Sequence, residues 1–252
     1  MSPNYIFINR YTSILNHRTI IAMVMAIATT FFAFELNIHF NIDITLISIA
    51  IIFPLVFTIR GSFRRREKAL EHLSQFRSAL KTLYYLVKEN NSLNEGEKTQ
   101  IINVLHEISD ETIKHLRRSN YDTSQLDETL HKVTIFINGR AEVINERFRS
   151  KIFRFMSDLH EAVDNLHGIH VHRTPISLKA YCKIFIYIFP LIYAPIIIDN
   201  VGLDKSQWIV YFIVLVTEYI LISLYNIQDQ LEYPFDDNGL DDIKLDIFRL
   251  NR

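Results

Sequence analysis

Apolar residues in this chain gather in four runs, two near the start and two after a long polar stretch. The runs are Thr19–Leu36, Ile42–Ile59, Ala180–Ile198 and Trp208–Ile227. Each approaches the roughly 20 apolar residues that cross a hydrocarbon core. Such runs must be helical, because no water is present there to satisfy the backbone. The pattern predicts an all-α membrane protein with four transmembrane helices.

The loops inside each pair of spans are short, Asn37–Asn41 and Asp199–Gln207. Neither can hold a domain, so each pair is predicted to be a hairpin that returns to its starting side. Both termini and the polar stretch then share that side. We expect a first membrane segment (residues 1–62), an inserted helical domain (63–179), a second membrane segment (180–228) and an acidic tail (229–252).

Basic residues flank the spans on the side of the inserted domain, whereas the short loops contain only Lys205. The flanking residues are Arg10, Arg18, Arg60, Arg64, Arg65, Arg66, Lys68, Arg173 and Lys179. The positive-inside rule therefore places both termini and the inserted domain in the cytoplasm of a multi-pass cell-membrane protein. The first run ends in Phe31, Phe32, Phe34 and Glu35, whereas a cleavable signal peptide ends in small residues. We therefore predict that this run is a membrane anchor that is retained in the mature protein.

The inserted domain shows helical spacing of apolar residues and no strand alternation. Apolar residues recur at threes and fours from Phe63 to Lys88, so the second span is predicted to continue as one amphipathic rod. A second helix is predicted from near Ser92, with Glu95 in its first turn, to Ser119. A third is predicted from Thr123 or Ser124 through Leu159, with Gly139 and Gly168 as candidate breaks or ends.

Composition narrows the function classes. The chain has 27 basic and 28 acidic residues, and no cluster of basic side chains predicts a nucleic-acid partner. It contains no Gly-rich phosphate loop, HExxH, CxxC or G-x-S-x-G motif, so we expect no enzyme activity. The one cysteine, Cys182, lies within the third span and cannot form an intrachain disulfide.

Three histidines, His167, His170 and His172, lie close together before the third span. Three imidazoles can bind zinc or copper. Ten histidines are scattered through the chain, however, and no cysteine or HxxxH pairing supports a metal site. We assign no metal and no cofactor to them.

Glu218 is an acid inside the fourth span, where a charge is costly and usually faces a bundle interior or a water-filled path. The alternative is a protonated carboxyl that is hydrogen-bonded to a neighbouring threonine or tyrosine. Lys183, near the start of the third span, can reach the interface with its side chain and is not expected to pair with Glu218.

The second span carries Ile49, Phe53 and Phe57 at i, i+4 and i+8, on one helix face. Pro54 frees the carbonyl of Ala50, a defect that a water-filled cavity tolerates better than lipid does. Around an axis, several copies of this face would form hydrophobic rings that gate by dewetting. In an arbitrary membrane helix such a stripe more often faces lipid or packs in a core.

Three segments together resemble the bestrophin family. The stripe in a second span that runs into a basic segment resembles the bestrophin neck. Arg173-Thr174-Pro175-Ile176, followed by Tyr181 and Phe189-Pro190, is similar to the T-P-I-P…Y…L-P-F stretch of bacterial bestrophins. Leu231-Glu232-Tyr233-Pro234-Phe235, followed by Leu240–Asp246, is similar to their L-E-x-P-F…D-L-P-L-D segment. The segments occur in the family's order and layout, although Arg66-Glu67-Lys68-Ala69 replaces the family's aromatic pair.

The resemblance implies a homopentameric ring in the lipid membrane around a central pore, with Ile49, Phe53 and Phe57 of five second helices at the neck. It implies passive conduction of small monovalent ions, with chloride favoured and sodium or potassium as the alternative. A second, cytosolic constriction is expected between Ile135 and Ile144.

The resemblance also indicates a candidate divalent-cation or tail-clasp site. Its members would be Gln230, Glu232, Asp236, Asp237 and Asp241. Asn238 stands where the calcium-binding animal bestrophins have a carboxylate, so calcium is not expected as a cofactor, although an oxygen-rich site is retained as a hypothesis.

Two other functions stay open. In one, four helices anchor a cytosolic helical module that binds a partner or senses a signal without conducting. In the other, the protein is a proton-coupled carrier that uses Glu218, although broken helices in inverted repeats, which are typical of carriers, are not evident.

Overall fold

The structure is a computed structural model, and it describes residues 16–202, 206–237, 239 and 241–250. Four residues used in the sequence argument, Arg10, Lys205, Asn238 and Leu240, lie outside these ranges. The regular elements of the described part are α2 (His17–Glu35), α3 (Thr45–Lys88), α4 (Glu95–Arg117), α5 (Ser124–Asn138), α6 (Glu146–Val171), α7 (Ile176–Val201), α8 (Gln207–Leu231) and a 3₁₀ turn, η1 (Leu245–Phe248). The all-α prediction is confirmed for these residues.

Among the described residues, four helical stretches are long and apolar enough to cross a membrane, and they coincide with the four predicted spans in α2, α3, α7 and α8 to within a few residues. All four helices start at other residues than the predicted spans do, and a side-chain cap explains two of these starts. The Asn16 side chain accepts hydrogen bonds from the N–H groups of Arg18 and Thr19, so α2 begins at His17. The Asp43 side chain accepts the Thr45 N–H at 2.9 Å, so α3 begins at Thr45 and not at Ile42.

Helix α3 is continuous over 44 residues, which confirms the predicted rod. The helix predicted after Thr123 is interrupted at Gly139, one of its two candidate breaks, so two helices, α5 and α6, occupy that region. Gly139 ends α5, and the Asn145 side chain caps a new helix by accepting the Arg147 N–H at 2.8 Å. Gly168 lies inside α6 and neither breaks nor ends it.

The described residues fall into two compact units. The first lies within Met1–Arg64 and Thr174–Glu232, and we call it the apolar unit; the second lies within Arg65–Arg173 and Tyr233–Arg252, and we call it the amphipathic unit. Helix α3 contributes to both. Each unit has its own buried apolar clusters.

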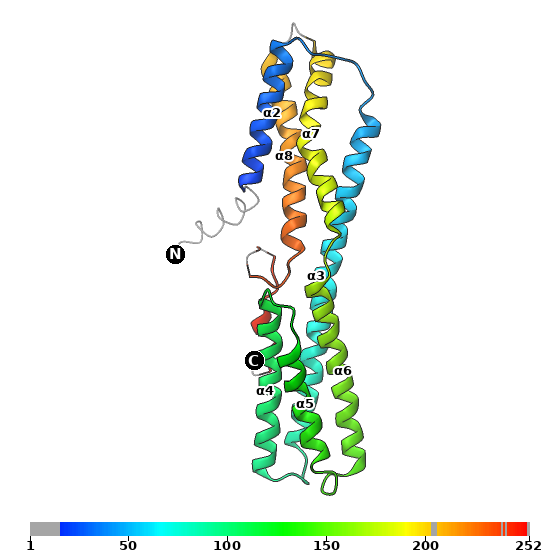
Figure 1. Ribbon diagram of the computed structural model, residues 1–252, viewed down its shortest axis with the longest axis vertical. Helices are drawn as coiled ribbons and strands as arrows, with labels where there is room; N and C mark the ends of the chain where they lie inside the picture. Colours follow the sequence, from blue (N-terminus) through cyan, green and yellow to red (C-terminus); the bar gives the residue numbers. More distant parts are fainter. Residues whose placement is uncertain (1–15, 203–205, 238, 240, 251–252) are drawn as a thin grey trace, which may run out of the picture. The chain divides into compact units, whose positions relative to one another are not determined.

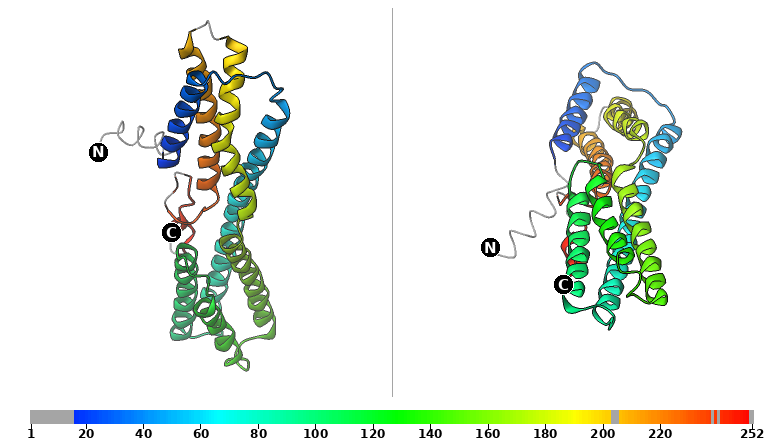
Figure 2. Two further views of the ribbon diagram at one scale, coloured as in Figure 1. Left: turned by 45° about the horizontal axis from the view of Figure 1, so that its top comes forward. Right: turned by 60° about the horizontal axis from the view of Figure 1, so that its bottom comes forward.

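In the apolar unit, α2, α7 and α8 lie side by side (Figures 1 and 2). The buried face of α2 consists of small residues at helical spacing: Thr19, Ala22, Ala26, Thr30 and Ala33. Small side chains let helix backbones approach closely, which is how membrane helices gain packing energy in the absence of a water-driven hydrophobic effect.

In the amphipathic unit, α4, α5 and α6 enclose an aliphatic core together with the second part of α3 (Figures 1 and 2). Leu73, Phe76 and Leu80 of α3 are fully buried in it. The chain after α8 also belongs to this core, through Phe235, Ile243, Leu245, Phe248 and Leu250. Helix α4 begins with a capping box between Asn94 and Glu97.

Candidate functional site

The stripe of α3 lies on the face that points away from the apolar unit. Ile49, Phe53 and Phe57 are 44%, 55% and 60% exposed, whereas Ile51 and Leu55 on the opposite face are 2% and 1% exposed. The rings of Phe53 and Phe57 follow one another with centroids 6.1 Å apart. The stripe is therefore available to line a pore or to meet lipid.

Pro54 lies inside α3 and leaves the Ala50 carbonyl without its usual helical donor. The hydroxyl of Tyr181, from α7, donates a hydrogen bond to this carbonyl at 3.2 Å. A protein group therefore satisfies the freed carbonyl. Tyr181 is also the tyrosine of the segment that follows Pro175 in the bestrophin-like pattern.

Four charged side chains form a connected cluster at the ends of α2, α7 and α8, and we call it the four-charge cluster. Its members are Arg18, Lys179, Asp229 and Glu232. Asp229 pairs with Arg18 and with Lys179, each at 2.7 Å, and Lys179 also pairs with Glu232 at 2.7 Å. The two positive and two negative charges cancel. Such pairing is needed for a charged side chain as buried as that of Glu232, which is 2% exposed.

Neutral polar groups extend this cluster. The second oxygen of Glu232 accepts the Thr174 N–H at 3.0 Å, and Gln228 donates to Glu232 at 3.0 Å and to Ser62 of α3 at 3.4 Å. Asn226 bonds Asn16 and Thr19 beside α2. The cluster thus ties the ends of all four apolar helices together.

Sequence reasoning found only part of the four-charge cluster. Arg18 and Lys179 counted as flanking charges, and Asp229 was missed. The sequence did contain a signal for this pairing. Arg18 and Lys179 precede the first and third spans and Asp229 follows the fourth, so opposite charges are expected on the same side of the membrane. The structure also joins two of the bestrophin-like segments, because Thr174 belongs to one and Glu232 to the other.

Glu218 is 1% exposed within α8. Both of its carboxylate oxygens are buried, and among the described residues neither has a hydrogen-bond partner. The alternative of a carboxyl bonded to a neighbouring threonine or tyrosine is therefore not found among the described residues, and the Thr217 hydroxyl donates instead to the Ile213 carbonyl at 2.9 Å. Lys183 of α7 is exposed.

The five tail residues considered for a cation site are divided between the units. Gln230 and Glu232 belong to the apolar unit, and Asp236, Asp237 and Asp241 to the amphipathic unit. Asp237 pairs with Arg117 at 2.9 Å. Within the described residues, no group of three or more histidine, cysteine or acidic side chains could hold a metal ion.

A neighbouring acid of the tail, Asp242, has an altered titration. Burial raises its pKa to about 6, and a hydrogen bond with Asp236 adds to the rise. The Gly239 N–H opposes this by donating to an Asp242 oxygen at 2.6 Å. The two acids therefore share a proton more readily than isolated carboxyls do.

The remaining residues of the bestrophin-like segments lie at helix ends, inside helices or in the core. Pro175 precedes α7 as its N-cap, and Pro190 is buried inside α7. The Pro234 carbonyl accepts the Ile243 N–H at 2.9 Å, which folds the tail back on itself. Phe235 is 2% exposed in the core of the amphipathic unit.

The histidines form a different trio from the one considered in the sequence. His115 of α4 bonds His167 of α6 through Nε2 and Nδ1 at 3.0 Å, and the His115 and His170 rings are 5.7 Å apart. His167 and His170, at i and i+3, share one face of α6, whereas His172 is the C-cap of that helix and lies outside the trio. Burial, followed by the neighbouring histidines, lowers the pKa of His115.

The segment expected to hold a cytosolic constriction exposes two apolar side chains. Ile135 and Val143 are 59% and 58% exposed, whereas Ile137 and Ile144 are 0% and 3% exposed. Ile135 lies on α5, so it is the exposed isoleucine of this segment on a regular helix.

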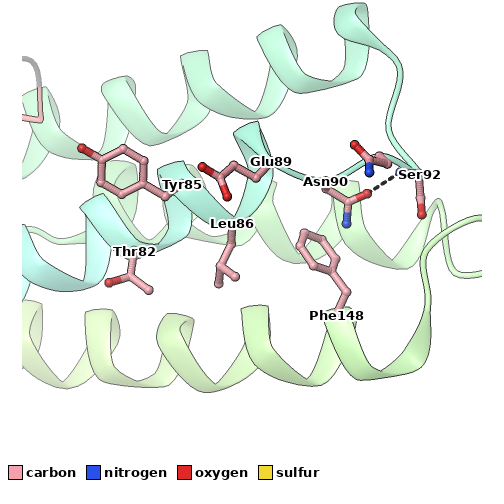
Figure 3. Close-up of a pocket in the computed structure, with 8 residues that line it drawn as sticks. Thr82, Tyr85, Leu86, Glu89, Asn90, Ser92 and Phe148 are labelled. Carbon is pink, nitrogen blue, oxygen red and sulfur yellow. Dashed lines mark hydrogen bonds between the residues drawn. The ribbon is translucent and has the colours of Figure 1, made fainter.

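A pocket of about 460 Å³ lies beside the end of α3, and Figure 3 shows the residues that line it. It is lined by Thr82, Tyr85, Leu86, Glu89, Asn90, Asn91, Ser92 and Phe148. Asn90 accepts the Ser92 N–H at 2.7 Å, so part of its polar capacity is used in the turn. Glu89 is the one ionisable carboxylate in the lining, and nothing there resembles a catalytic pair.

No protein-family model matches the chain, and no curated protein matches it either. Several solved structures, however, are similar to it in fold. A crystal structure of a bacterial Bestrophin homolog from Klebsiella pneumoniae, solved by Zn-SAD phasing, has a TM-score of 0.76 at 17% identity, over 92% of this chain and 93% of that chain. A mutant of the same homolog has a TM-score of 0.77 at 15% identity, with the same coverage.

A further crystal structure, described as that of a membrane protein, has a TM-score of 0.77 at 15% identity over 92% of this chain and 93% of that chain. The likeness extends over nearly the whole of both chains. The chain therefore has the bestrophin-like fold that its motifs indicated.

Proposed function

We propose that this chain, which has the fold of the bacterial bestrophin homologues, forms an ion channel that conducts small monovalent ions passively, with anions favoured. The observation that carries the proposal is the outward apolar stripe of α3 within this fold. Ile49, Phe53 and Phe57 are all at least 44% exposed although α3 has a buried face available for apolar residues.

The physical argument concerns dehydration. When several copies of α3 surround an axis, three side chains of the stripe form three successive apolar rings. An ion that passes them must lose part of its water, and a narrow apolar passage can also empty of water and close. The rings set a barrier without fixing the sign of the ion, so the preference for chloride over sodium or potassium rests on the family resemblance.

The proposal includes a homopentamer in the cell membrane, with the termini and the amphipathic unit in the cytoplasm. The basic flanks of the apolar helices support this orientation. Ile135 is the proposed second constriction, because its side chain is exposed on α5 while Ile137 is buried. The tail acids Asp236, Asp237 and Asp241 are proposed as part of a tail clasp rather than as calcium ligands.

The test is single-channel recording from purified protein in planar bilayers. Phe53→Ala and Phe57→Ala should each raise the conductance, because a smaller side chain widens its ring and shortens the dry passage. Ile52→Ala is the matched control, since Ile52 is 47% exposed on the same helix but lies off the stripe. Unchanged conductance in both phenylalanine variants would remove the stripe from the pore.

The same preparation discriminates the alternatives. Reversal potentials in asymmetric KCl report whether anions or cations permeate. A monomer or dimer in detergent, with no conductance, would favour a membrane anchor or sensor. Transport that saturates and depends on pH would favour a proton-coupled carrier, for which the buried, unpartnered carboxyl of Glu218 is the specific support.

A further inference from the structure

We infer that Tyr181 is a positioning residue for the stripe: its hydroxyl replaces the hydrogen bond that Pro54 removes from α3 and thereby fixes the direction of that helix against α7. The consequence for conduction rests on the proposed function. The contact itself does not.

The need for such a group follows from the chemistry of proline. Pro54 has no N–H, and its ring pushes against the carbonyl four residues earlier, that of Ala50. The hydrocarbon core of a membrane contains no water that could donate a hydrogen bond to this carbonyl. Helices with an unpaired carbonyl at a proline therefore bend or find a new donor, and a neighbouring helix commonly supplies it.

Here the new donor comes from a residue 131 positions away in the sequence. Tyr181 Oη lies 3.2 Å from the Ala50 carbonyl oxygen. The Tyr181 ring packs against Phe185, one turn further along α7, with centroids 4.4 Å apart. This packing fixes the direction in which the hydroxyl points.

The neighbouring contacts between α7 and α3 are mostly apolar, apart from a side-chain hydrogen bond between Cys182 and Thr58. Cys182, next to Tyr181, is buried in the same apolar cluster as Ile51 and Leu55 of α3. Apolar contacts of this kind resist separation of the helices but allow small rotations, because they have no preferred angle. A hydrogen bond to the Ala50 carbonyl does have a preferred angle.

The location of this bond matters for the stripe. Ala50 follows Ile49 directly, and Pro54 follows Phe53 directly. Pro54 and the bond to Ala50 therefore lie between the first and the last side chain of the stripe. Any change of direction there rotates Ile49 relative to Phe57 and alters the alignment of the proposed rings.

A double-mutant cycle tests the inference. Pro54→Ala returns an N–H that can bond the Ala50 carbonyl, so the Tyr181 hydroxyl is then no longer needed. We expect Tyr181→Phe to lower the Tm of the detergent-purified protein by about 2–4 °C in the Pro54 background, the shift typical of one lost interaction in a chain of this size. In the Pro54→Ala background the same substitution should leave Tm unchanged.

Tyr219→Phe is the matched control, because it removes a hydroxyl from a tyrosine that is 41% exposed on α8 of the same unit. It should leave Tm unchanged in both backgrounds. An equal loss for Tyr181→Phe in both backgrounds would overturn the inference, and so would the absence of any loss in the Pro54 background.

Conductance gives the second readout. Tyr181→Phe should shift the single-channel conductance, and Pro54→Ala should suppress that shift; a shift of the same size in both backgrounds would contradict the positioning role. If no variant conducts at all, the proposed function fails while the Tm cycle still decides whether Tyr181 compensates for Pro54.

Discussion

The two parts of helix α3 obey opposite rules of exposure. Up to Arg64, its outward face carries Ile49, Phe53 and Phe57, all exposed. From Arg65 onward, Phe76 and Leu80 are completely buried and polar side chains are exposed. One continuous helix therefore has two patterns of exposure. Apolar side chains face outward in its membrane-spanning part and inward in the part whose surface is polar.

Two ion pairs, one from each unit, also differ in their exposure to solvent. In the apolar unit, the four-charge cluster is closed in, with a side-chain exposure of 16% for Lys179 and 1% for Glu232. In the amphipathic unit, pairs such as Lys132–Glu107 lie at the surface, 45% and 44% exposed. Buried pairs are costly to break and surface pairs are worth little, so equal substitutions in the two units should have unequal effects.

The largest expected effect comes from truncating a phenylalanine in each part of α3. Phe76→Ala should reduce the free energy of unfolding by about 3–5 kcal/mol, because Phe76 is fully buried and leaves a cavity. Phe57→Ala should cost much less, because Phe57 is 60% exposed. Thermal unfolding of both variants in detergent measures this, and equal losses would mean that Phe57 is packed within the protein.

Removal of one charge from each unit gives the next largest difference. Lys179→Met should cost about 2–4 kcal/mol, because it leaves the nearly closed Glu232 without its cation, although Lys179 and Asp229 are partly exposed. Lys132→Met should cost about 1 kcal/mol or less. If the two variants unfold at the same temperature, the four-charge cluster contributes no more than a surface pair.

The smallest effect is a pH dependence in the tail. The folded pKa of Asp242, about 6, lies above its ordinary value of 3.8. Between these values the folded state keeps a proton that the unfolded state has released, so this group makes stability fall as pH rises from about 4 to 6. Asp242→Asn should flatten that part of the Tm profile, and a wild-type slope in the variant would show that another group is responsible.

Much of the fold could be predicted because its causes are local. Four apolar runs, the continuous α3 rod and the exposed stripe follow from hydrophobicity and from 3.6-residue spacing. The break between α5 and α6 was predicted only as one of two candidates, Gly139 and Gly168, because the apolar spacing continues across it. A cap at Asn145 and the turn after Gly139 decided it instead.

In the candidate site too, local features could be predicted from the sequence and long-range partners could not. Sequence alone placed Ile49, Phe53 and Phe57 on one face and identified Pro54 as a defect. It could not find the donor for Ala50, because Tyr181 is 131 residues away. Nor could it pair Arg18 with Asp229, which are 211 residues apart, or replace His172 by His115 in the histidine trio.

By itself, then, the sequence determined which segments are helices, which of them are apolar enough for lipid, and which face of α3 is apolar. These depend on each residue's own preference for water and on regular helix geometry. Only the tertiary structure decided which polar groups satisfy one another. Those partners come from distant segments, and the low polarity around them makes each unpaired group costly enough to select one arrangement.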